Sequence, residues 1–198
     1  MIKTKHSWFG DPGLPFDSVP AFEGDDRHKS MIDFYKQLTS FEGMNEMQAR
    51  YYSSLAACVR PVRVVSALEV WTPEEVNLLK LAIRPAKKEC YRVAALLSKV
   101  TSGRARYVEG QFWAHCFGVD HAFNYIPNRG VFVDFTAEFA LGYDPSQEAY
   151  VAFRDFSEEQ VWEIISKNGY YGNIYNEVYL LENRGRQEKV RKTAQGNV

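Results

Sequence analysis

Three cysteines carry the most nucleophilic side chains of this sequence: Cys58, Cys90 and Cys116. None belongs to a CxxC pair, so the sequence predicts neither a zinc ribbon nor a thioredoxin-type redox site. In a reducing compartment all three are expected to be free thiols, and a free cysteine is most often a small buried apolar residue. A nucleophilic cysteine differs from this ordinary role by its surroundings, because the thiolate is the reactive form.

Cys90 is the cysteine whose surroundings favour a thiolate. The segment that follows Pro85 has apolar residues at helical spacing, and these are Cys90, Val93, Ala94 and Leu97. Cys90 is therefore expected on the core-facing side, in the first turn of a helix. The N–H groups of a helix start favour negative charge, and Lys87 and Lys88 lie close in sequence. The same pattern also fits a core cysteine, so both roles remain open.

A histidine and an aspartate follow on two expected strands, residues 119–126 and 131–136. If the intervening turn pairs Ile126 with Val131, His121 and Asp134 are diagonal neighbours on one face, ~7–8 Å apart at the backbone. A shift of one residue would place them on opposite faces. A buried aspartate is costly unless it is paired, and its carboxylate would orient the imidazole ring and stabilise its cation. The alternative is a structural His–Asp pair with no thiol nearby.

These residues, in this order, resemble the core of the transglutaminase-like, papain-like cysteine enzymes. The matching segments are Glu89-Cys90-Tyr91, Asp120-His121-Ala122-Phe123 and Val133-Asp134-Phe135-Thr136, and Tyr107-Val108-Glu109-Gly110 is similar to small domains of this kind. The resemblance spans residues 85–140, well under half of the chain. It implies a small stand-alone member of the superfamily, with N-terminal helices packed on an antiparallel sheet in a papain-like core and with no cofactor.

The resemblance implies acyl transfer by a Cys-His-Asp triad. The Cys90 thiolate would attack an amide or ester carbonyl, His121 would carry the proton, and Asp134 would orient His121. The backbone N–H of Cys90 is the expected oxyanion donor. Water as acceptor gives an amide or peptide hydrolase, such as a thiol protease, and an amine gives a transglutaminase or N-acyltransferase. The implied substrate is a protein, a peptide or a small amide.

Two other interpretations use the same region. Cys116 and His121, with His115 or Asp120, could ligate a metal ion, but a fourth zinc ligand is missing from the sequence pattern. The chain could instead be a non-catalytic binding or inhibitor protein on the same fold, with Cys90 buried beyond the reach of solvent.

Two further carboxylates, Glu109 and Glu138, could belong to a site. Charged residues in such positions are usually solvated, and this is what we expect of both.

The elements around these residues indicate a single α+β domain, because helices are followed by a run of strands. We expect an irregular arm over residues 1–28, a catalytic-type domain over 29–182 and a polar, basic tail over 183–198. The expected helices are 30–41, 44–59, 72–84, a helix that opens at 85 and includes 97, and 157–168. The expected strands are 63–68, 106–113, 119–126, 131–136, 148–156 and 175–181.

Composition narrows the class of protein. The chain has 24 Lys and Arg against 25 Asp and Glu, which argues against a protein that mainly coats nucleic acid. No apolar run approaches the ~18 residues of a membrane span. The first residues lead into Pro, Gly and Asp and do not resemble a signal peptide. A cytoplasmic protein of unknown oligomeric state is therefore expected.

Overall fold

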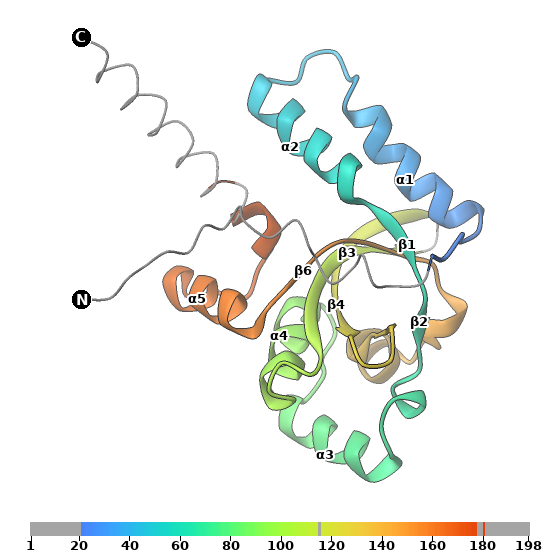
Figure 1. Cartoon of the computed structure of the whole chain (residues 1–198), viewed down its shortest axis with the longest axis vertical. Coiled ribbons are helices and arrows are strands. Elements are labelled where there is room, and N and C mark those ends of the chain that lie inside the picture. Colours follow the sequence, from blue (N-terminus) through green and yellow to red (C-terminus); the bar gives the residue numbers. More distant parts are fainter. Residues whose placement is uncertain (1–20, 115, 178–179, 181–198) are drawn as a thin grey trace.

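The computed structural model describes residues 21–114, 116–177 and 180 of the 198 residues. These residues combine helices with a curled six-stranded sheet (Figure 1). The expected tail and the first 20 residues of the expected arm lie outside this description. The arm is shorter than expected at its other end, because helix α1 already begins at Asp26, where Asp25 caps it in a box with His28.

The sheet is mixed, with the strand order β1-β6-β3-β4-β5-β2. The purely antiparallel sheet expected from the sequence is therefore wrong, because β2 runs parallel to β5, whereas all other pairs are antiparallel. Only Arg63 separates β1 from β2, yet the two strands lie at opposite ends of the order, so the sheet must curl to bring its edges together. The strands are β1 (Arg60–Val62), β2 (Val64–Val65), β3 (Arg106–Ala114), β4 (Phe117–Ile126), β5 (Val131–Val133) and β6 (Tyr150–Phe156).

Helices lie around this sheet (Figure 1). Figure 1 shows α1 and α2 at one end of the molecule and α3 and α4 at the other. Capping boxes begin α3, at Thr72, and α5, at Ser157, where the sequence predicts the helices 72–84 and 157–168. The α-helices are α1 (Asp26–Leu38), α2 (Glu46–Cys58), α3 (Pro73–Ile83), α4 (Cys90–Val100) and α5 (Glu158–Asn168). The shorter turns are η2 (Ala67–Glu69), η3 (Ala137–Leu141) and η4 (Pro145–Gln147).

The expected last strand, 175–181, is wrong, because residues 174–177 are helical. The Asn173 side chain accepts the backbone N–H of Asn176 at 2.7 Å, which is the geometry of a helix cap. Tyr175 is buried against Phe153 and Tyr51, so this side chain packs from a helical turn.

The hairpin of β4 and β5 has the register that the sequence predicts, with Ile126 opposite Val131 and Asn124 opposite Val133. The expected strand 131–136 is too long, however, since β5 ends at Val133. Asp134 then begins a helical turn. Its Oδ1 accepts the N–H groups of Thr136 at 2.9 Å and Ala137 at 3.0 Å. Residues 117–123 of β4 therefore pair with β3 on one side and have no β5 partner on the other.

Helix α4 packs along β4 and brings its N-terminus toward this unpaired stretch. Val93 and Leu97 are buried in a cluster with Ile126, Val133 and Phe135, as the helical spacing predicts. Burial of two such side chains contributes about 1.5–3 kcal/mol each. Asn124 of β4 donates to the carbonyl oxygen of Ala94 at 2.9 Å and to that of Arg106 at 3.3 Å. These contacts fix the position of α4, and hence of Cys90, relative to β4.

Candidate active site

Cys90 is the first residue of α4 and is half-buried. Its N-cap, Glu89, makes no side-chain hydrogen bond to the first N–H groups of the helix. The first N–H groups of a helix have no partner within the helix, so they are available to an incoming negative charge.

Arg92 holds the start of α4 in place. Its guanidinium group binds the Glu89 carboxylate at 2.6 Å and the carbonyl oxygens of Ile83 at 3.0 Å and Arg84 at 2.8 Å. One side chain thus joins the end of α3 to the start of α4. The intervening chain turns sharply, with positive φ at Arg84 and Lys88. This arrangement limits the positions that the Cys90 backbone can take.

His121 and Asp134 form a buried pair. The His121 Nε2 atom lies 2.6 Å from Asp134 Oδ2, and the residues are 6% and 1% exposed. The Tyr150 hydroxyl donates to the same oxygen at 3.0 Å, while Oδ1 accepts the two backbone N–H groups of the helical turn. All of these groups favour the carboxylate form of Asp134, and together they hold it in one orientation.

The Cys90 side chain lies close enough to the His121 ring to help raise the pKa of the imidazole. Because Asp134 occupies Nε2, Nδ1 is the ring nitrogen that remains for the sulfur. The structure therefore brings Cys90, His121 and Asp134 together, from the start of a helix, the middle of a strand and the residue that follows the next strand.

The electrostatics of the pair favour the charged forms. Burial disfavours the imidazolium, but the Asp134 carboxylate and the Cys90 contact outweigh burial and raise the pKa of His121 to about 10. Burial alone raises the pKa of the Asp134 carboxyl, whereas the charge and hydrogen bond of His121 lower it below its ordinary value. A cationic ring beside a thiol favours the thiolate.

Aromatic rings surround the histidine. The ring of Phe112 lies 5.5 Å from that of His121, and those of Phe123 and Tyr150 lie 6.4 Å and 6.3 Å away, between centroids. Tyr143, 40% exposed, stacks on Phe112 at 6.0 Å and extends this aromatic wall to the surface. Rings that exclude water lower the local dielectric, so the charge interactions inside are stronger than in solvent.

Sequence reasoning missed Tyr150 and the two N–H groups that bind Asp134. Tyr150 lies on β6, whose pairing with the rest of the sheet has no local signal in the sequence. The N–H groups could have been found, because aspartate is a preferred residue at the start of a helix.

Glu109 and Glu138 have structural roles, and the expectation that both are solvated is wrong. Glu109 is 2% exposed and accepts hydrogen bonds from the Tyr107 hydroxyl and from the N–H groups of Ile174 and Tyr175. It fastens the last described helical turn to β3. Burial raises its pKa to about 7, against the effect of these donors. Glu138 accepts hydrogen bonds from the hydroxyl of Ser66 at 2.6 Å and from the backbone N–H of Ala67 at 2.8 Å, and these bonds connect η2 to η3.

The other two cysteines have different surroundings. Cys58 contacts the carbonyl oxygen of Leu55 and the Tyr175 hydroxyl, and burial raises the pKa of its thiol. Cys116 is exposed on the turn between β3 and β4. Within residues 21–114, 116–177 and 180, no three His, Cys, Asp or Glu side chains are grouped to hold a metal ion. His115, one ligand of the metal interpretation, lies outside those residues.

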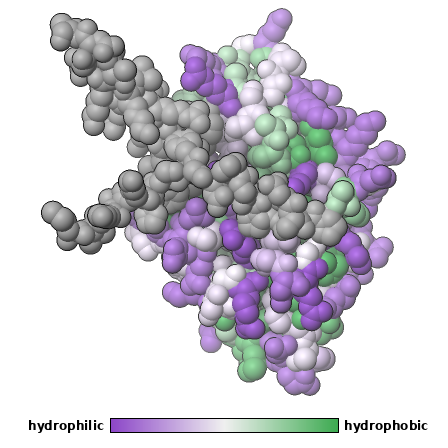
Figure 2. Space-filling model, in the orientation of Figure 1, coloured by the Kyte–Doolittle hydropathy of each residue, from purple (hydrophilic) through white to green (hydrophobic). Residues whose placement is uncertain are grey.

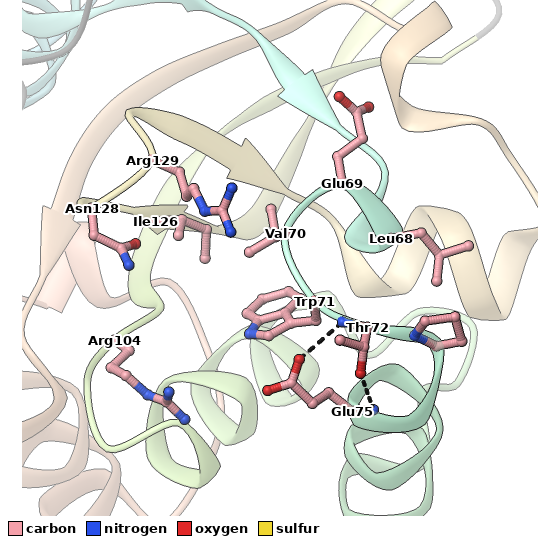
Figure 3. Close-up of a pocket in the computed structure, with 11 residues that line it drawn as sticks. Leu68, Glu69, Val70, Trp71, Thr72, Glu75, Arg104, Ile126, Asn128 and Arg129 are labelled. Carbon is pink, nitrogen blue, oxygen red and sulfur yellow. Dashed lines mark hydrogen bonds between the residues drawn. The ribbon is translucent and has the colours of Figure 1, made fainter.

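A separate pocket of about 500 Å³ lies between the start of α3 and the turn that joins β4 to β5. Figure 3 shows Trp71 at its centre, with Arg104, Asn128 and Arg129 on the side opposite Leu68 and Thr72. None of the three triad residues lines it. Trp71 contacts Phe135, the neighbour of Asp134, edge-on at 5.8 Å.

Hydrophilic and hydrophobic side chains share the outer surface. Figure 2 shows a face on which hydrophilic residues predominate, with smaller hydrophobic areas between them. Large exposed apolar residues on or near α1 and α2 include Phe34, Phe41 and Met47. No helix in the described part of the chain has the length and apolar character needed to cross a membrane.

In comparisons with known proteins, no family model, no curated protein and no solved structure matches this chain.

Proposed function

We propose that this chain is a cysteine-dependent acyl-transfer enzyme with a transglutaminase-like, papain-like core. The observation that carries the proposal is the buried, hydrogen-bonded His121–Asp134 pair with the Cys90 side chain near enough to affect the pKa of His121. A structural His–Asp pair needs no thiol beside it. The half-buried sulfur at an uncapped helix start is an additional argument for chemistry.

The geometry supports the following sequence of steps. The Cys90 sulfur attacks the carbonyl carbon of an amide, and the oxyanion accepts hydrogen bonds from N–H groups at the start of α4. His121 gives its Nδ1 proton to the leaving amine as the C–N bond breaks, which leaves a thioester on Cys90. Water or a second amine then attacks the thioester, His121 takes the proton of the attacker, and the sulfur leaves. Water gives hydrolysis and an amine gives transfer.

Asp134 acts in these steps by position and charge. Its carboxylate keeps Nε2 protonated, so that Nδ1 faces the sulfur in every step. It stays ionised, because four donors already bind its two oxygens. Tyr150 helps to hold the carboxylate and does not touch the reacting atoms.

Selective labelling with iodoacetamide at pH 6 tests the proposal. We expect Cys90 to be alkylated at least about tenfold faster than Cys58 and Cys116, because an ordinary thiol is under about 1% ionised at this pH. Mass spectrometry of the digested protein gives the rate at each cysteine. Equal slow labelling of Cys90 and the exposed Cys116 would overturn the proposal. Such a result would favour a non-catalytic binding or inhibitor protein on the same fold.

A further inference from the structure

Asp120 presents a negative charge next to the proposed catalytic residues. It precedes His121 on β4, and successive residues of a strand point to opposite faces, so its side chain points away from the His121 ring. Asp120 is exposed. Its Oδ1 is 3.3 Å from the Gln111 amide nitrogen and 3.5 Å from the Tyr35 hydroxyl. Among the described residues, Oδ2 has no hydrogen bond and the carboxylate has no cationic partner.

Three tyrosine side chains lie near this carboxylate, since Tyr35 is 3.5 Å from Oδ1 and Tyr51 and Tyr91 pack against the cluster in which Tyr35 is buried. Tyr35 comes from α1, Tyr51 from α2 and Tyr91 from α4, so the group joins three elements that are far apart in the sequence. Burial and then the negative charge of Asp120 raise the pKa of both Tyr35 and Tyr51 well above the ordinary value. Both phenol groups therefore remain neutral at ordinary pH.

Tyr91 links the carboxylate to the nucleophile. It follows Cys90 on α4, and burial followed by the charges of Glu109, Cys90 and Asp120 raises its pKa far above the usual range. Tyr91 thus lies beside Cys90 on α4 and packs against the cluster that contains Tyr35, whose hydroxyl is 3.5 Å from Asp120. A group bound at Asp120 would be part of a molecule whose reacting carbonyl or amine could reach Cys90.

We propose that Asp120, with Tyr35, Tyr51, Tyr91 and Gln111, forms a subsite for an alkylammonium group of the substrate. We refer to these five residues as the Asp120 subsite. A carboxylate with a free oxygen is the usual partner of an ammonium group, and the faces of neutral phenol rings attract cations. The buried amide of Gln111, 5% exposed, donates to Oδ1 of this carboxylate and adds no charge. The inference depends on the proposed function, because it assigns a substrate class to that site.

A matched set of methanethiosulfonate reagents tests this charge preference. In each reaction the Cys90 sulfur forms a disulfide with the reagent's sulfur, and methanesulfinate leaves, so only the attached group differs. The reagents carry a 2-ammonioethyl, a methyl or a 2-sulfonatoethyl group. Glutathione in solution is the reference thiol. We expect the ratio of the cationic to the anionic rate at Cys90 to exceed that of glutathione by about tenfold or more at low salt. The reason is that the Asp120 carboxylate attracts a nearby cationic reagent and repels an anionic one.

Asp120→Asn should lower that ratio by about tenfold, with each rate taken relative to that of the neutral reagent in the same variant. Glu163→Gln is the matched control, since it removes one exposed negative charge from α5 and should leave the ratio as it is. Asp120→Ser gives a second neutral variant if the first folds poorly. A ratio at Cys90 that is equal in wild type and both Asp120 variants would overturn the subsite. Slow labelling of Cys90 by the neutral reagent would instead refute the proposed function.

The ammonium group could belong to the acyl donor or to the acceptor amine, and esters distinguish the two. Attack of Cys90 on p-nitrophenyl acetate releases p-nitrophenolate and leaves an acetyl thioester. If 1,5-diaminopentane cleaves this thioester faster than butylamine does, and the difference disappears in Asp120→Asn, the ammonium group belongs to the acceptor. If Cys90 reacts faster with p-nitrophenyl glycinate than with the acetate, and this difference disappears in the same variant, the ammonium group belongs to the acyl donor. Absence of both preferences would contradict the subsite.

Discussion

Cys90→Ala should abolish formation of an acyl-enzyme with p-nitrophenyl acetate, with a loss on the order of 10³-fold or more, because it removes the only atom that forms the covalent bond. The measurement is the burst of p-nitrophenolate, together with the mass of the acetylated protein. Cys90 is only half-buried, so alanine should be accommodated with little change in the free energy of unfolding.

His121→Gln should cause a loss of similar size, because glutamine can donate to Asp134 and cannot shuttle a proton to the sulfur. It is preferable to His121→Ala, which would leave a buried carboxylate without its partner. Cys116→Ala is the control for the loss of a thiol, and it should be close to neutral. A full burst in Cys90→Ala would end the assignment of the nucleophile.

Asp134→Ala should lower the free energy of unfolding by about 3–5 kcal/mol at pH 6, because it leaves the buried His121 ring without its carboxylate and frees two backbone N–H groups. Urea denaturation measures the change.

The size of this change should depend on pH. Because the pKa of Asp134 is lowered in the folded protein, its contribution to the free energy of unfolding is present above the pKa of the unfolded chain. That contribution is lost as the pH falls through the pKa of the folded protein. The raised pKa of His121 means that its contribution is present below about pH 6.5 and is lost toward about pH 10. The difference between wild type and variant should therefore be greatest near pH 4–6.5.

Asp134→Asn separates stability from chemistry. The asparagine oxygen can still accept the N–H groups of Thr136 and Ala137, so the loss of stability should be smaller than with alanine. Its amide, however, would donate to His121 Nε2, and the proton of the neutral ring would move to Nδ1, which faces the sulfur. We expect acylation to fall by about 10²-fold, less than in Cys90→Ala. Wild-type acylation in Asp134→Asn would show that the carboxylate does not orient the ring.

Local pattern in the sequence predicted the parts of the site that lie close together along the chain. The alternation of residues around the 127–130 turn predicts the register of β4 and β5, and hence His121 and Asp134 on one face. The 3.6-residue spacing after Pro85 predicts the buried side of α4. Both signals depend on neighbouring residues only, which is why they could be read without the fold.

The remaining features depend on contacts between distant segments. The parallel pairing of β2 with β5 depends on how the sheet curls, and the hydrogen bond from Tyr150 depends on β6 lying beside β3. Glu109 reads as a surface residue in the sequence, because its partners, Ile174 and Tyr175, come about 65 positions later in the chain. The end of β5 at Val133 is a local feature, in which the capping preference of Asp134 overrides the strand propensity of the residues that follow.

The most direct test of the account is the rate of Cys90 alkylation by iodoacetamide between pH 5 and 9, in wild type and in His121→Gln. Because the pKa of His121 is raised to about 10, the ring stays cationic beside the sulfur over this range. We predict that the wild-type rate is nearly level from pH 6 to 8.5, whereas His121→Gln shows the rise of about 10²-fold that is typical of an ordinary thiol. A wild-type profile with the same single rise near pH 8.5 as the variant would contradict the account, since Cys90 and His121 would then not act as one unit.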